Sequence, residues 1–241
     1  MCEICNPKKK YTDCICGDKF TSIKNNNLEI ETKKYENFDI LKELTISTIT
    51  VCCDFCSKID INKFKNFYSQ NISKAFYNSI NVYITVKYQD RIKISVKIFS
   101  NGKIQMAGLT NSVSTCYAIR KIFKRIDKLN CFEDENKKIK NLRICMINSD
   151  FKINKNIKQK KLCEIFDSDI SEEYDISRYT FNPSKYPAIN LKIKGDEDSR
   201  CITCAIFRPG SIIITGGEDF LKYKKIYLNI LNVLNNNNLI Y

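Results

Sequence analysis

Four cysteines near the start of the chain have the spacing that comes closest to a chemical site: Cys2, Cys5, Cys14 and Cys16. Zinc takes four thiolates in a tetrahedron, and the Cys2-x2-Cys5 pair has the spacing of a zinc knuckle. The second pair is spaced Cys-x-Cys, and the gap between the two pairs is short for a zinc ribbon. Two interpretations therefore stay open: a zinc site, or an unstructured segment with incidental cysteines.

The composition excludes much enzymology. The chain of 241 residues contains no His and no Trp. Without His there is no His-based acid/base catalysis, no Ser-His nucleophile and no His metal ligand. The sequence also lacks a Gly-rich phosphate loop, a paired-carboxylate motif and a nucleophile elbow. We therefore expect a protein that is not an enzyme and requires no cofactor, zinc at the cysteine cluster excepted.

The chain is basic and has a globular composition. It carries 40 Lys and Arg against 27 Asp and Glu, a net charge of +13, and 43% of its residues are hydrophobic. A basic excess of this size favours a polyanionic partner. No window approaches the roughly 18 apolar residues of a membrane span, and no apolar signal core opens the chain. We expect a soluble, intracellular protein with no membrane partner. In a reducing compartment, cysteines within strand-like or helix-like runs should be small buried hydrophobes, namely Cys116, Cys145, Cys163, Cys201 and Cys204.

An internal repeat organises the rest of the chain. Ile98, Phe99, Gly102, Ile104 and Gly108 recur, without a gap, as Ile206, Phe207, Gly210, Ile212 and Gly216. Each copy follows an alternating strand and precedes a helical run, so a whole supersecondary unit is duplicated.

The coarse periodicity predicts the same elements in both halves. Strands are expected at about 44–51, 82–88, 92–99 and 103–108, with helices near 61–70 and 112–129. The second half repeats them with strands at about 139–146, 187–194, 200–207 and 211–216, and helices near 155–165 and 218–235. The predicted organisation is a Cys-rich segment (1–38), a first repeat (39–132) and a second repeat (133–241), in a duplicated α+β protein.

The alternation within the strands separates two faces of the sheet. In 92–99, the face with Ile94, Val96 and Ile98 is apolar, and the opposite face is polar but ends in Phe99. Phe207 ends the corresponding face of 201–207. An exposed aromatic at the tip of such a face can wedge between base pairs. Packing of each Phe on a neighbouring loop is the alternative, and the repetition at matching positions favours the functional interpretation.

The repeated pattern Ile-Phe-x-x-Gly-x-Ile-x-x-x-Gly before a long helix resembles the TATA-box-binding protein (TBP) family. The resemblance covers about residues 39–241 and includes the strand that opens each repeat, with 46–51 in the first and 139–142 in the second. Residues 181–189 are similar to the family's second stirrup. The resemblance implies a TBP saddle: two pseudo-symmetric repeats forming one curved antiparallel sheet of about ten strands, with helices on the convex face and DNA beneath.

The resemblance also implies which residues contact the minor groove. Phe99 and Phe207 match one wedge in each half. The family's spacing puts their partners at about Val82 and, with a short insertion around residues 195–198, at Tyr186. Asn141 matches the groove-floor asparagine of the second half, and Leu44 stands at its place in the first. Thr215 matches the floor threonine, which Ala107 replaces in the first half. Lys97, Gln105 and Arg143 stand where the family has apolar contacts. The implied DNA-binding set is completed by Ile46, Ala205 and Ile213.

The resulting expectation is a minor-groove DNA-binding factor that bends A/T-rich promoter DNA and nucleates transcription initiation together with initiation factors or RNA polymerase subunits. The acidic stirrup contact that the family offers to transcription factor IIB is missing, with Asn182 and Ser184 at those places. Such drift is similar to TBP-like proteins of large cytoplasmic DNA viruses, which implies a host cytoplasmic viral factory or the virion; a cellular paralogue would imply the nucleus. A TBP-fold interaction platform that has lost specific DNA binding is the alternative.

Overall fold

The computed structural model describes residues 40–67, 72–88, 90–135, 137–167, 174–194 and 201–241. The possible zinc cluster of Cys2, Cys5, Cys14 and Cys16 and the predicted 1–38 segment lie outside these residues. The described chain forms two compact units. The first includes Thr48–Cys145, and the second includes Met146–Tyr241 together with the preceding strand as far as Ser47. The predicted division into repeats at residue 133 stays a prediction.

The first unit contains strands β1 (Ile40–Asp54), β2 (Ile72–Ala75), β3 (Ser79–Tyr88), β4 (Asp90–Phe99) and β5 (Lys103–Leu109), with helices α2 (Ile61–Phe67) and α3 (Ser112–Lys128). The second contains β6 (Lys140–Ile153), β7 (Ile176–Asn182), β8 (Tyr186–Ile193), β9 (Ile202–Phe207) and β10 (Ser211–Thr215), with α4 (Gln159–Phe166) and α6 (Phe220–Asn236). β1 and β6 each begin in one unit and continue into the other.

Both units have the same antiparallel topology. The strand order is β1-β5-β4-β3-β2 in the first unit and β6-β10-β9-β8-β7 in the second. The duplication read from the repeat is therefore present in the strand order. The sequence missed β2 and β7, placed the start of α4 a few residues early and ended β6 too soon.

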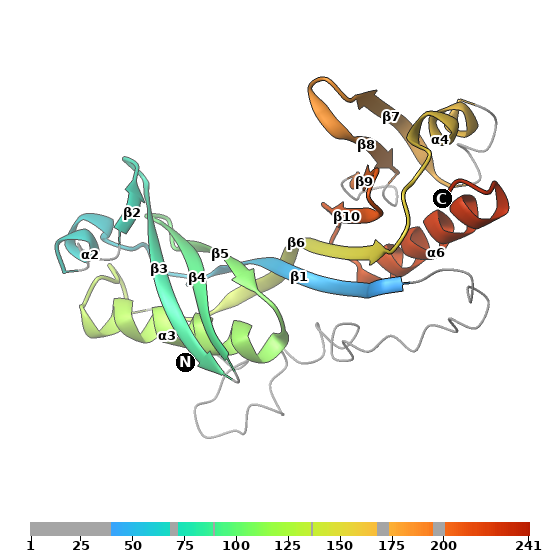
Figure 1. The fold of residues 1–241 in the computed structure, drawn as a ribbon. Helices are drawn as coiled ribbons and strands as arrows, with labels where there is room; N and C mark the ends of the chain where they lie inside the picture. The colour runs from blue at the N-terminus through green and yellow to red at the C-terminus, as the bar shows by residue number, and fades with distance from the viewer. Residues whose placement is uncertain (1–39, 68–71, 89, 136, 168–173, 195–200) are drawn as a thin grey trace. The chain divides into compact units, whose positions relative to one another are not determined.

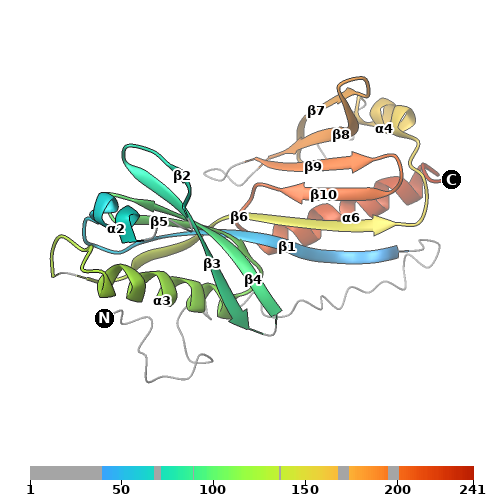
Figure 2. The ribbon, with the colours of Figure 1, turned by 60° about the vertical axis from the view of Figure 1, so that its left-hand side comes forward.

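One long helix covers one face of the sheet in each unit (Figures 1 and 2). In the first unit, Phe123 of α3 packs edge-on against Phe55, with ring centroids 5.1 Å apart. In the second, Tyr227 of α6 packs edge-on against Phe151 at 4.6 Å, and the hydroxyl of Tyr223 donates to the carbonyl of Ile147 at 2.5 Å. Burial of such aromatic side chains, about 150–250 Å² each, holds the helices on the sheets.

The cysteines bear out the expected packing role only in part. Cys116 and Cys204 are buried, and so are Cys53 and Cys131. Burial raises the pKa of the Cys204 thiol to about 12, which keeps it protonated and unreactive at neutral pH. Cys201, however, is exposed, and Cys145 and Cys163 are half-buried. These three are not the core residues that their position in the sequence suggested.

The repeated glycines hold the turns that follow the two repeated Phe residues. Gly102 and Gly210 have φ of +85° and +84°, and their amides donate to the carbonyls of Phe99 and Phe207. A Cβ on Gly210 would lie 2.3 Å from the carbonyl oxygen of Ile153. Only glycine fits both the backbone conformation and this close approach.

We expect Gly210→Ala to lower the free energy of unfolding by about 3 kcal/mol, because left-handed strain and a backbone clash add. Urea titration followed by circular dichroism measures the change. Ser211→Ala, one residue along, is the matched control and should change the value by less than about 0.5 kcal/mol. Equal effects of the two substitutions would show that the turn can rearrange.

Candidate nucleic-acid interface

Each unit has one sheet face that none of the described helices covers, which we call the open face. In the first unit it consists of Asn81, Tyr83, Lys93, Ser95, Lys97, Phe99, Gln105 and Ala107. In the second it consists of Asn148, Asp150, Asn190, Lys192, Thr203, Ala205, Phe207, Ile213 and Thr215. Directly paired residues on neighbouring strands lie on the same face of a sheet. The strand registers therefore place the residues of each set on one face.

The open face of the first unit ends in aromatic side chains. Phe99 is partly exposed at the end of β4, on the face opposite the buried Ile98. The ammonium of Lys97 lies 4.9 Å from the centroid of the Phe99 ring and 5.2 Å from that of Phe76. Phe76 is 46% exposed and Tyr77 is 95% exposed. The tip of the β2–β3 hairpin therefore offers aromatic surface to a ligand beside Phe99.

The open face of the second unit ends in a matching aromatic pair. Tyr186 is 45% exposed, and its ring lies edge-on to that of Phe207 with centroids 5.7 Å apart. Phe207 pairs with Ala188 across β9 and β8, as Phe99 pairs with Ser79 across β4 and β3. The structure thus brings together the two aromatic residues that the resemblance implied for this half.

Val82 is not an exposed wedge, and this expectation is wrong. Val82 is fully buried, because it pairs directly with Val96 on the helix-covered face of the first unit. Tyr77 occupies the place equivalent to Tyr186, since each lies two residues before the partner of a repeated Phe. The sequence signal was the shared Tyr-x-x-Ile-Asn, in Tyr77–Asn81 and Tyr186–Asn190.

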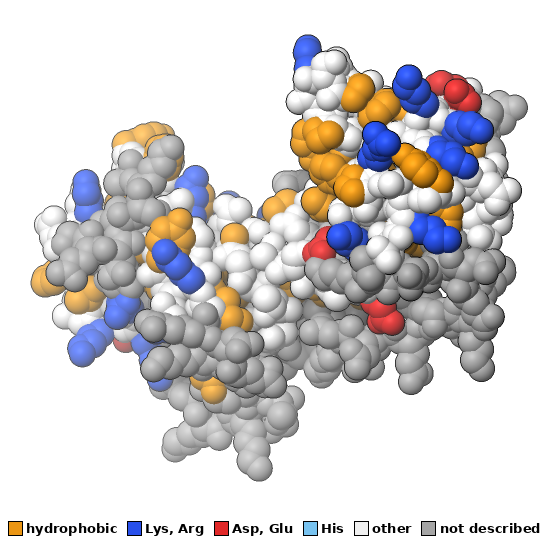
Figure 3. Space-filling model, viewed as in Figure 1, with side chains coloured by type: hydrophobic (Ala, Val, Ile, Leu, Met, Phe, Trp, Pro, Cys, Tyr) orange, Lys and Arg blue, Asp and Glu red, His pale blue; other side chains and the backbone are white. Residues whose placement is uncertain are grey.

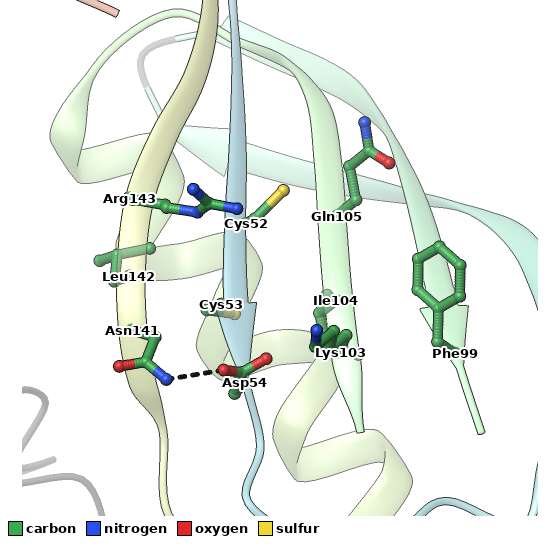
Figure 4. Close-up of a pocket in the computed structure, with 10 residues that line it drawn as sticks. All are labelled: Cys52, Cys53, Asp54, Phe99, Lys103, Ile104, Gln105, Asn141, Leu142 and Arg143. Atoms are coloured by element: carbon green, nitrogen blue, oxygen red, sulfur yellow. Dashed lines mark hydrogen bonds between the residues drawn. The ribbon is translucent and has the colours of Figure 1, made fainter. Parts of the chain in front are cut away.

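A hollow of about 640 Å³ on the first unit brings four of the predicted residues together: Phe99, Gln105, Asn141 and Arg143 (Figure 4). The side-chain amide of Asn141 donates to the carboxylate of Asp54 at 2.7 Å. Asn141 has φ +53°, a conformation that asparagine tolerates better than most residues. Asp54, at the end of β1, was not among the predicted residues, and its carboxylate adds a hydrogen-bond acceptor to the hollow.

The floor of the second unit's open face contains a polar pair. The hydroxyl of Thr215 donates to the side-chain oxygen of Asn148, its partner across β10 and β6. Ile213 is 39% exposed on the same face, whereas Ala205 beside it is almost covered. Asn148 was missed from the sequence. In the structure it lies between the buried Ile147 and Ser149 and therefore points to the open face.

Asn141 and Thr215 belong to different units, and Asn148, rather than Asn141, accompanies Thr215. In the first unit, Ala107 is half-buried and pairs with Thr50. Leu44 is buried, so its side chain cannot provide the groove contact that its position implied. Ile46, by contrast, is partly exposed.

Comparison with known proteins agrees with this architecture. Residues 43–129 match the model of the family "Transcription factor TFIID (or TATA-binding protein, TBP)". The chain is 26% identical over 251 residues to a protein of Acanthamoeba polyphaga mimivirus named "TATA-box-binding protein-like", covering 85% of this chain and 68% of that protein.

The solved structure of Methanococcus jannaschii TBP superposes with a TM-score of 0.58 at 17% identity, covering 80% of this chain and 99% of the archaeal one. This likeness shows the TBP fold. The expected fold is thereby confirmed, and the family consists of DNA-binding factors that are not enzymes. In the described residues no group of three or more Cys, Asp or Glu could hold a metal ion, and none of the described helices is long and apolar enough to cross a membrane. The duplicated strand order, the match of residues 43–129 to the family model and the archaeal structure together show that the chain has the TBP fold and is similar to the TATA-binding protein family.

Proposed function

We propose that the protein binds the minor groove of double-stranded DNA with its two open faces, bends the duplex and thereby nucleates transcription initiation. The observation that carries the proposal is the exposed aromatic cluster at the end of each open face, Phe99 with the β2–β3 tip and Phe207 with Tyr186. Aromatic wedges unstack base steps and kink the duplex towards the major groove. No chemical step is needed.

Sequence preference would come mainly from deformation of the DNA. Pyrimidine–purine steps such as TA are the least costly to kink, so A/T-rich promoters are the expected sites. The apolar Ile213 supports close contact with a groove floor in the second unit. The first unit carries more charged side chains on its open face or in its hollow, namely Lys93, Lys97, Asp54 and Arg143, against Asp150 and Lys192 on the open face of the second unit. We therefore assign the tighter fit on A/T steps to the second unit.

The compartment in which the protein acts would depend on whether the DNA it binds is viral or cellular. With a viral template the factor would act in the host cytoplasmic viral factory or in the virion, and with a cellular one in the nucleus. The bent duplex would present a surface to an initiation factor or to RNA polymerase subunits. The similarity to a mimivirus protein favours the viral setting.

A second candidate function is a protein-interaction platform without specific DNA binding. The observation that favours it is Lys97, whose ammonium is already engaged by the rings of Phe76 and Phe99, together with the acidic Asp54 in the adjoining hollow. A carboxylate at this place repels phosphates, and a cation held by aromatic rings is less available to them.

Salt dependence distinguishes the two functions. If Lys97 neutralises a phosphate, Lys97→Leu should flatten the plot of log affinity against log salt by about 0.9, with the bend retained. Lys124→Leu is the matched control, because Lys124 is exposed on the helix α3 rather than on the open face. Fluorescence anisotropy with a labelled A/T-rich duplex at several salt concentrations gives both slopes. Identical slopes for the two variants would favour the platform.

A further inference from the structure

A second groove lies on the second unit, outside its open face. Its volume is about 510 Å³, and it is lined from the start of α4, the β7–β8 turn, the β9–β10 turn and Tyr241. Its apolar lining consists of Phe181, Pro183, Tyr241 and the buried Ile157. Tyr241 is 55% exposed. A ligand could therefore bury aromatic surface here that is now in water.

The groove is held in shape by hydrogen bonds before any partner binds. The guanidinium of Arg208 donates twice to the hydroxyl of Tyr241, at 3.2 and 2.9 Å, which fixes the ring at the edge of the groove. The amide of Ile157 donates to the carbonyl of Arg208 at 2.7 Å. The side chain of Gln159 donates to a carbonyl on β8 and to one on β9. Such preorganisation lowers the entropic cost of binding.

The charged side chains that line this groove are all basic. Lys158, Lys160, Lys161 and Arg208 line it, and none of its described lining residues is acidic. Lys160 and Lys161 are exposed in the first turn of α4. Across the part of the second unit that carries β7 and β8, several Lys and Arg side chains lie among hydrophobic ones, with an acidic patch at the upper right of the view (Figure 3). An acidic ligand with a bulky apolar group would match both properties.

We infer that this groove, formed by Phe181, Tyr241, Lys160, Lys161 and Arg208, is a docking site for an acidic segment of a partner protein that inserts an aromatic or aliphatic side chain. The apolar lining receives the anchor, and the lysines pair with the flanking carboxylates. A DNA backbone would use the cations but would gain little from the apolar lining between them. The site lies outside the open faces, so a docked segment and a bound duplex use different residues.

Two fluorescein-labelled peptides of twelve residues test the inference by fluorescence polarisation. One is rich in Asp and Glu and carries a central Leu-Phe pair, and the other has Ser in place of that pair at the same charge. We expect the Leu-Phe peptide to bind at least tenfold more tightly than the Ser peptide. Tyr241→Ala should remove most of this difference, because it deletes the ring that lines the groove.

Charge reversal supplies the matched comparison. Lys160→Glu/Lys161→Glu should weaken binding of the Leu-Phe peptide at least tenfold, whereas Lys124→Glu/Lys128→Glu on α3 should change it less than twofold. All four lysines are exposed, so circular dichroism should be unchanged. Equal losses from both pairs would mean general attraction to a basic protein and would overturn the site. A loss of duplex affinity in Lys160→Glu/Lys161→Glu without loss of peptide binding would assign these cations to DNA instead and would also overturn it.

Discussion

The substitutions Phe99→Ala and Phe207→Ala should each weaken binding to an A/T-rich duplex about 30-fold and reduce the bend in the DNA. Unstacking a base step costs a few kcal/mol, which the inserted ring offsets, and loss of a central aromatic contact costs about 2 kcal/mol. Folding should survive, because both side chains lie on the open faces and neither is fully buried. Electrophoretic mobility of phased duplexes measures the bend, and anisotropy measures the affinity.

Phe67→Ala is the control for these two variants. Phe67 is 64% exposed at the end of α2. The substitution therefore removes the same kind of side chain from a surface that is not part of an open face. Its affinity for the duplex should stay within twofold of the wild type. If the Phe99 and Phe207 variants unfold, or bind as tightly as the Phe67 variant, the rings are structural and not wedges.

The double substitution Phe76→Ala/Tyr77→Ala should lower the affinity for DNA, whereas the single substitution Val82→Ala should lower the stability of the fold. The double variant should keep its stability, since both rings are exposed, and lose about tenfold in duplex affinity. Val82→Ala should cost about 2 kcal/mol of folding free energy, because it leaves a cavity in a closely packed core. Its folded fraction should bind DNA within threefold of the wild type.

Urea titration and anisotropy on the same samples give both quantities. The pair of variants decides between the family's spacing, which put the wedge at Val82, and the strand register, which puts it at the hairpin tip. Weak DNA binding by a stable Val82→Ala protein would contradict the register.

Much of the fold could be predicted because local and long-range signals agree. The alternation in β4 assigns Lys97 and Phe99 to one face and Ile98 to the other, and the burial confirms it. The two glycine turns recur because the same backbone approach is required after each repeated Phe. β2 and β7 were missed because they are edge strands with one neighbour, and short edge strands carry a weak apolar alternation.

The site was less predictable, because insertions change spacing without changing register. Tyr77 precedes Phe99 by 22 residues, and Tyr186 precedes Phe207 by 21. The family's spacing without an insertion leads to Val82 in the first half, which lies in the wrong phase of the strand and is buried. The expectation for Leu44 fails for another reason: its burial does not follow the alternation of the buried Ile49 and Val51 further along β1, where the strand register shifts between Ile49 and Thr50.

The half of the chain that matches the family model is not the half in which the resemblance placed the polar groove contacts. Asn141 and Thr215 suggested that the second half is closer to the family, yet the family model matches residues 43–129 in the first half. The model match depends on the whole pattern of the repeat, including the buried residues, whereas the contacts depend on a few exposed positions.

Bending of DNA by the wild-type protein can be measured directly as energy transfer between dyes at the two ends of an A/T-rich duplex of about 30 base pairs. At saturating protein, the transfer should rise because the ends approach each other, and the affinity should fall with salt according to the number of neutralised phosphates. A duplex of random sequence should need more protein for the same change. Saturable binding that leaves the end-to-end distance unchanged on both duplexes, at low and physiological salt, would contradict minor-groove bending by this protein.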